Sequence, residues 1–134
     1  MQESTDGGKL NRGLAVLNTG FSFLKRPLTK EEFEDLSILG WLTQVFQAAY
    51  LIWDDIMDYT EYRRGKPCRY RTADTGLLAI NDASLLKSCI FILLQNHSQN
   101  HPEYLAFIEL FNEAGFRTEL GQLCDTTTAR NGAA

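Results

Sequence analysis

Apolar residues recur at intervals of three and four along almost the whole chain, and this spacing limits the folds that the chain can adopt. Leu10, Leu14 and Leu17 place apolar side chains on one face of a first helix. The same period returns over residues 77–96 and from residue 105 to 123. No segment shows the alternation of apolar and polar residues that a half-buried strand requires. The spacing therefore predicts an all-α fold.

The second predicted helix has the clearest start signal. Thr29 is followed three residues later by Glu32, which is a capping-box pattern. Residues 33–53 are apolar on most faces, and this predicts a central helix. Residues 59–75 contain turn-forming residues and no sustained period, so we predict an ordered loop there.

Composition narrows the class of protein. The 134 residues, 44% of them hydrophobic, suit one domain. A net charge of −4 argues against binding nucleic acid or anionic lipid through overall charge. We see no signal peptide, and no apolar stretch that approaches the roughly 20 residues needed to cross a bilayer. The three widely spaced cysteines indicate neither a disulfide framework nor a zinc site. We therefore predict a cytoplasmic protein with no membrane span and no nucleic-acid partner.

Three aspartates crowd the stretch DDIMD, directly after the apolar segment. Asp54 and Asp58 are four residues apart and share a helix face, with Asp55 close to the same side. One interpretation is an exposed helix end, where water screens the repulsion. The other is a site for a hard cation such as Mg²⁺, which binds through a few carboxylates and substrate phosphates. The apolar helix that precedes the acids favours the second interpretation.

A basic segment follows the acidic one and contains Arg63, Arg64, Lys66, Arg69 and Arg71. An acidic cluster beside a basic one suits a polyanion held through metal ions on one side and by guanidinium groups on the other. The two clusters can equally neutralise one another. Lys9 and Arg12, three residues apart at a helix start, would add an anion site without carboxylates, although such cations are usually solvated surface.

Five motifs occur in order along the chain: GGKLNRG, LGWLTQVFQAAYLIWDDIMD, RRGKPC, LLAINDA and TELGQLCD. Together they resemble the N-terminal part of a short-chain trans-isoprenyl diphosphate synthase of the farnesyl diphosphate synthase type. The resemblance implies a partial isoprenoid synthase helical bundle over residues 1–128, followed by a frayed tail over 129–134. It also implies helices around a deep cavity and a homodimer. A class I terpene cyclase shares D-D-x-x-D but fits GGKLNRG and RRGKPC poorly.

The resemblance implies a role for each matching residue. Asp54, Asp55 and Asp58 would form the Mg²⁺ site on the allylic diphosphate, and Asp125 would add a carboxylate from another helix. The implied substrate-binding residues are Lys9, Arg12, Gln47 and Arg64 for isopentenyl diphosphate, Arg63 for the allylic diphosphate, and Gln122 facing the cavity. Asp54, Asp58 and Arg63 are the implied catalytic residues.

The implied reaction joins isopentenyl diphosphate head-to-tail to dimethylallyl or geranyl diphosphate and gives geranyl or farnesyl diphosphate. Negative charge would develop on the departing diphosphate, and Mg²⁺ together with Arg63 would stabilise that charge in the transition state. Ala49 and Tyr50 lie one turn before the acids, where bulky residues limit product length in the family. Both side chains can equally serve helix packing.

The family's second aspartate-rich motif does not occur in these 134 residues. We therefore expect little prenyl transfer by the chain alone, together with self-association through apolar helix faces. Two functions remain open. The first is a prenyltransferase, and the second is a non-catalytic binding or regulatory subunit that associates with a full-length synthase.

Overall fold

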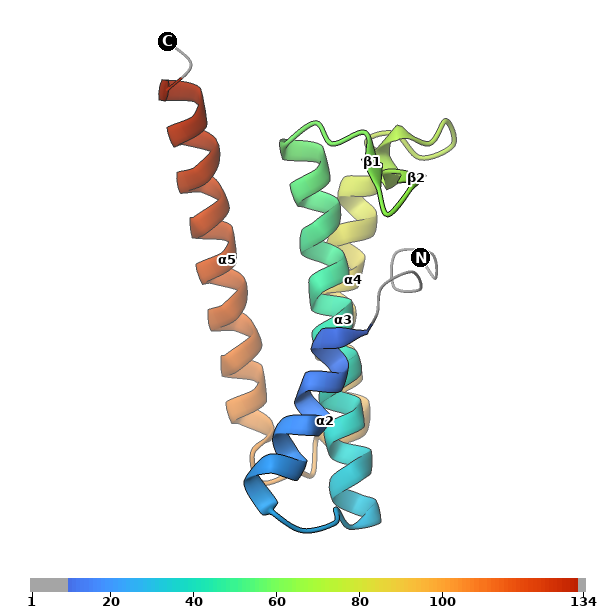
Figure 1. Cartoon of the computed structure of the whole chain (residues 1–134), viewed down its shortest axis with the longest axis vertical. Helices are drawn as coiled ribbons and strands as arrows, with labels where there is room; N and C mark the ends of the chain where they lie inside the picture. Colours follow the sequence, from blue (N-terminus) through green and yellow to red (C-terminus); the bar gives the residue numbers. More distant parts are fainter. Residues whose placement is uncertain (1–9, 133–134) are drawn as a thin grey trace.

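The computed structural model describes residues 10–132, with side chains described to residue 128, and these residues are almost wholly helical (Figure 1). The elements are α2 (Asn11–Leu24), α3 (Lys30–Met57), β1 (Tyr62–Arg63), β2 (Lys66–Pro67), the 3-10 helix η1 (Arg69–Arg71), α4 (Leu78–Ser98) and α5 (Tyr104–Gly132). The predicted all-α class is confirmed.

Helix α2 crosses α3 where two glycines meet. A Cβ atom added to Gly40 would lie 2.8 Å from the carbonyl oxygen of Gly13, so a larger residue would force the two backbones apart. This close crossing brings the start of α2, including Arg12, against the middle of α3.

Helix α3 is the central element, as its apolar faces predicted. Its first turn has the predicted capping box: the Thr29 hydroxyl accepts from the Glu32 amide at 3.2 Å, and the Glu32 carboxylate accepts from the Thr29 amide at 2.8 Å. Buried residues of α3 join two clusters with the neighbouring helices. One contains Ala48, Ala49, Ile52, Ala79, Ala83 and Leu86, and the other contains Leu42, Ile90, Leu94 and Phe111.

The segment 59–75 contains more regular structure than the predicted loop. β1 and β2 pair antiparallel around a turn in which Arg64 (φ 55°) and Gly65 (φ 77°) both have left-handed backbones. That conformation suits a two-residue hairpin, and strands of two residues are too short to show an alternating pattern. Arg69 of η1 then forms an ion pair with Asp82 of α4 at 2.9 Å. This ion pair anchors η1, the element that follows the hairpin, to α4.

Helix α5 stands beside α3 in Figure 1 and extends to Gly132, past the boundary at residue 128 that we predicted. The Thr126 and Thr127 hydroxyls donate to backbone carbonyls one turn earlier, each at 2.8 Å. These bonds satisfy the hydroxyls within the helix itself.

By length and composition alone, α3 and α4 are each long and apolar enough to cross a membrane, which our sequence analysis did not anticipate. The charged residues of α3 gather near its two ends, which leaves residues 36–53 without a charged side chain. Within the described chain, both helices supply buried residues to the same cluster, including Ala48 and Ala83.

Candidate functional site

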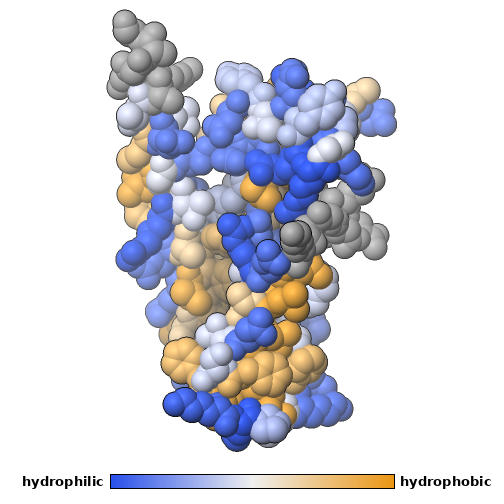
Figure 2. Space-filling model, viewed as in Figure 1, coloured by the Kyte–Doolittle hydropathy of each residue, from blue (hydrophilic) through white to orange (hydrophobic). Residues whose placement is uncertain are grey.

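A groove of about 750 Å³ lies between α3 and α5, beside the start of α2. Figure 2 views this face: hydrophobic side chains gather over its middle and lower parts, and hydrophilic ones surround its upper part. The lining consists of Arg12 from α2, of Thr43, Phe46, Gln47, Tyr50, Leu51, Trp53, Asp54 and Met57 from α3, and of Thr118, Glu119, Gln122, Leu123 and Thr126 from α5. The groove therefore combines an apolar wall with a few polar side chains, as small-molecule sites commonly do.

The three aspartates near the end of α3 have different environments. Asp54 is half-buried and lines the groove. Asp55 is only 5% exposed and faces the hairpin. Asp58 is exposed and caps the C-terminus of the helix. Of the three, Asp54 alone borders the groove.

The Arg63 guanidinium binds two of these carboxylates. It lies 2.7 Å from an Asp55 oxygen and 3.0 Å from Asp54 Oδ2. Tyr59 has a left-handed backbone after the helix end, and the hairpin that follows carries Arg63 back over the acids. Burial alone would lower the pKa of Arg63, but the bond to Asp55 and the charges of both aspartates raise it above its usual value. Part of the basic segment thus neutralises the acids, which is one of the two interpretations of the sequence.

Cys68 packs against the same buried carboxylate. Its thiol is buried, and this burial together with a hydrogen bond to Asp55 raises the pKa of Cys68 to about 11. A thiol that stays protonated at neutral pH is a poor nucleophile. Cys68 is therefore a packing residue.

Three of the predicted substrate residues do meet at the groove. Arg12, Gln47 and Gln122 come from three different helices and line the same space as Asp54. The side-chain nitrogen of Gln122 is buried and has no hydrogen-bond partner among the described residues. A buried amide in that state costs free energy unless a ligand or water binds it.

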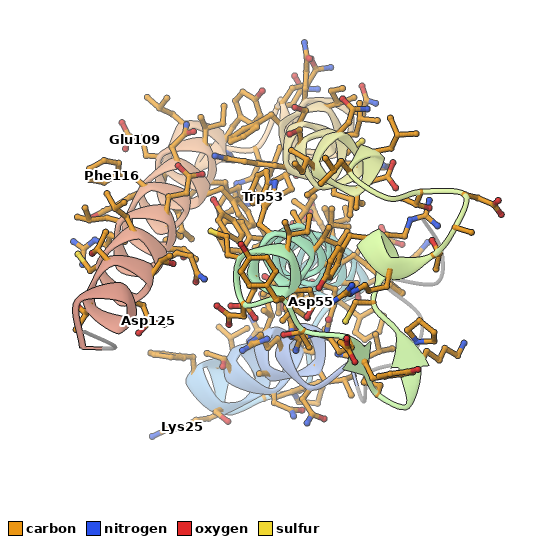
Figure 3. The ribbon with its side chains drawn as sticks, turned by 90° about the horizontal axis from the view of Figure 1, so that it is seen from above. Lys25, Trp53, Asp55, Glu109, Phe116 and Asp125 are labelled. Carbon is orange, nitrogen blue, oxygen red and sulfur yellow. The ribbon has the colours of Figure 1, made fainter. Side chains whose placement is uncertain are left out.

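The other predicted site residues within the described chain do not line the groove. Lys9 lies outside the described residues. Arg64 is exposed at the hairpin turn, and Asp125 is exposed on α5, well apart from Asp55 in Figure 3. Within the described part of the chain, no group of three or more His, Cys, Asp or Glu side chains could hold a metal ion. The structure does not combine the predicted metal ligands Asp54, Asp55, Asp58 and Asp125 into one cluster.

Ala49 and Tyr50, the two residues that the resemblance suggested as a limit on product length, have different positions. Ala49 is fully buried in the core between α3 and α4 and is not part of the groove lining. Tyr50 does line the groove. Helix packing is therefore the observed role of Ala49, whereas Tyr50 contributes its side chain to the groove wall.

Sequence reasoning missed two charged residues that contact Tyr50. The Tyr50 hydroxyl donates to Glu119 of α5 at 2.9 Å, and Lys87 of α4 binds the same carboxylate oxygen. Partial burial and the Glu119 bond raise the pKa of Tyr50, and the Lys87 bond lowers the pKa of Glu119. Glu119 carries a sequence signal, because it lies three residues before Gln122 on the same face. Lys87 has no comparable signal.

Comparison with known proteins points to the same family as the sequence motifs. The family described as Polyprenyl synthetase matches residues 1–133. A probable farnesyl diphosphate synthase of Dictyostelium discoideum is 45% identical over 135 residues, which cover 96% of this chain and 38% of that protein. The farnesyl pyrophosphate synthase of Saccharomyces cerevisiae is 46% identical, with 94% of this chain and 37% of the relative covered.

Among solved structures, a T. brucei farnesyl diphosphate synthase complexed with a bisphosphonate has a TM-score of 0.88 and 38% identity. The match covers 95% of this chain and 36% of that chain. The chain thus spans little more than a third of the length of these relatives.

Proposed function

The chain belongs to the polyprenyl synthetase family, and we propose that its groove binds an allylic diphosphate for head-to-tail condensation with isopentenyl diphosphate. One observation carries this proposal: Asp54, Arg12 and Gln122 meet from three helices at one largely apolar groove. A prenyl diphosphate has a polyanionic head and a hydrocarbon tail, and the groove offers matching chemistry to both. The comparisons give no support to hetero-association with a full-length synthase.

The two aspartates that face solvent or the groove fit Mg²⁺. This ion usually keeps several waters and binds through one or two carboxylates plus substrate phosphates, so it does not require a cluster of three acids. Asp54 and Asp58 lie four residues apart at the end of α3 and would hold it. A bound Mg²⁺ would neutralise charge that develops on the departing diphosphate.

The chain's own residues supply the remaining functions of the site. Arg63 keeps its charge and holds Asp54 in place from the hairpin side. Arg12 and Gln47 would bind the isopentenyl diphosphate head, together with Lys9 and Arg64. The apolar wall would keep water away from the allylic cation. We propose a ten- or fifteen-carbon product, since Tyr50 restricts the groove one turn below Asp54.

Calorimetry with dimethylallyl thiodiphosphate, an analogue that ionises slowly, tests the proposal on the full 134-residue chain. We expect binding that requires Mg²⁺ and that is lost in the double variant Asp54→Asn/Asp58→Asn. Asp74→Asn changes an exposed acid in the loop before α4 and serves as the matched control. Equal binding after chelation of Mg²⁺, or in the double variant, would contradict the proposed function.

A further inference from the structure

Tyr50, Glu119 and Lys87 form a polar latch that joins three helices at the groove. The Tyr50 side chain reaches from α3 to Glu119 of α5, with 2.9 Å between hydroxyl and carboxylate. Lys87 of α4 binds the same carboxylate oxygen. The Lys87 ammonium also lies 6.0 Å from the centre of the Tyr50 ring and 5.9 Å from the Trp53 ring, within the range of a cation–π contact.

The backbone of α5 is adapted to this arrangement at Gly115. A Cβ atom at this position would lie 2.9 Å from the Tyr50 hydroxyl oxygen, closer than real Cβ atoms approach. Because Gly115 has no side chain, the hydroxyl can lie against α5 and reach Glu119, one turn further along the helix. The ring is therefore held by its hydroxyl and is also packed against Phe46 and Trp53, with centroids 4.6 and 5.2 Å away.

We propose that Lys87 and Glu119 are positioning residues that hold the Tyr50 ring across the groove and so set the length of apolar chain that the groove accepts. This inference rests on the proposed function for its substrate class, a linear prenyl chain. Both residues retain substantial exposure, 34% for the Lys87 side chain and 47% for Glu119, so their ion pair contributes little to stability. Its contribution lies in the orientation of Tyr50.

Lys87 offers a clean test because it stands outside the described groove lining. A change at Lys87 can alter ligand preference only through Glu119 and the two aromatic rings. We would titrate the full chain with two uncharged alcohols, geraniol and farnesol, and follow Trp53 fluorescence in a Trp41→Phe background. The readout is the ratio of the two dissociation constants, which depends on the apolar groove and requires neither Mg²⁺ nor the diphosphate.

The native chain should bind geraniol more tightly than farnesol. Lys87→Met and Tyr50→Phe should each strengthen farnesol binding relative to geraniol binding by about tenfold. This is the discrimination that a hydrophobic pocket obtains from one methylene group. Lys87→Arg keeps the ion pair and should keep the native ratio. Arg117→Met breaks a comparable pair with Glu113 on α5 and is the control.

The inference is overturned if Lys87→Met changes the ratio no more than Arg117→Met does, or if the native chain binds neither alcohol. Equal unfolding temperatures of the two variants would show that a shifted ratio does not come from lost stability. The two proposals can fail separately. If Lys87→Met shifts the ratio of the two dissociation constants but the chain shows no Mg²⁺-dependent diphosphate binding, the proposed function is wrong and the positioning role of Lys87 and Glu119 still holds.

Discussion

Asp55 shows how a single buried carboxylate organises the chain around it. Its side chain is enclosed by Arg63 and Cys68, and its backbone carbonyl accepts from the Thr60 amide at 2.9 Å. A buried charge is tolerated only when it is paired and hydrogen-bonded. The hairpin therefore has a structural reason to return to the end of α3, separate from any contact with substrate.

Replacing Arg63 by Met should destabilise the chain, because it leaves the Asp55 carboxylate buried without its counter-ion. Breaking a buried pair typically costs several kcal/mol, and the partial exposure of Arg63 reduces this to about 2 kcal/mol. Urea unfolding followed by circular dichroism measures the change. Arg64→Met alters the adjacent exposed arginine and should have almost no effect. Equal losses in both variants would show that the ion pair is unimportant.

For individual residues, the sequence indicated neighbours that follow from spacing along one helix, but it did not indicate contacts that depend on how two helices pack. Asp54 and Gln47, which the family resemblance assigned to the site, both line the groove, and their separation of seven residues places them on the same side of α3. The pairing of Lys87 with Glu119 depends on how α4 and α5 come together, and no motif around Lys87 specifies that. Spacing alone also does not show that Asp55 turns to the hairpin and pairs with Arg63.

Among the elements, α3 has an N-terminus that is fixed by several interactions at once. The Glu32 carboxylate accepts from the Thr29 amide and also pairs with Arg26 at 2.6 Å. The Arg26 bond, the Thr29 bond and the Arg26 charge lower the pKa of Glu32 from 4.5 to about 2. A carboxyl group whose folded pKa is depressed stabilises the fold above its usual pKa and loses that contribution as pH falls.

The helix start should therefore weaken between about pH 4.5 and pH 2. Glu32→Gln should lower the unfolding temperature at pH 6 and have much less effect at pH 2, where the pH has reached the folded pKa and most of the stabilising contribution of the carboxylate is lost. Thermal scans across this pH range measure both chains. Glu34→Gln, in the same first turns of α3, is the control. A difference between native chain and Glu32→Gln that stays constant with pH would refute the prediction.

Replacing glycine by alanine should lower the stability of the chain at Gly65 and raise it at Gly121. Gly65 has a φ of 77° in the hairpin turn and open space around it, so alanine there should cost about 1 kcal/mol through backbone strain alone. Gly121 lies inside α5, also with open space, and alanine should stabilise that helix by about 0.5–1 kcal/mol. Chemical denaturation of both variants measures the change in the free energy of unfolding. If this change has the same sign in Gly65→Ala and Gly121→Ala, backbone conformation does not decide the effect.

Most of the helices could be predicted from the sequence. Four helices followed from the spacing of apolar residues, and the Thr29 capping box fixed the start of α3 within a residue. The hairpin was missed because its ladder is shorter than any period can reveal. Helix α5 continues beyond residue 123 to Gly132, and its last turns were not predicted because the polar residues there carry no apolar period.

The whole molecule presents large apolar side chains to solvent. Its accessible surface is 9236 Å², against about 7,100 Å² for a compact monomer of 15.2 kDa. On α5, Phe116 is 66% exposed and Leu120 47% exposed, one turn apart on one face. Figure 3 shows Phe116 pointing away from the other helices. Large apolar side chains that are exposed next to one another are typical of interaction surfaces.

We therefore predict that the 134-residue chain self-associates in solution, with α5 contributing to the contact. Burial of apolar area is the driving force, so association should strengthen with concentration and with salts that favour burial. Sedimentation equilibrium measures the mass over a range of concentrations. The double variant Phe116→Lys/Leu120→Lys should weaken association by placing two charges on the apolar face. Phe23→Lys changes an exposed aromatic side chain near the end of α2 and should leave association as it is. A monomeric mass at every concentration would refute the prediction, and equal weakening by Phe23→Lys would refute the role of α5.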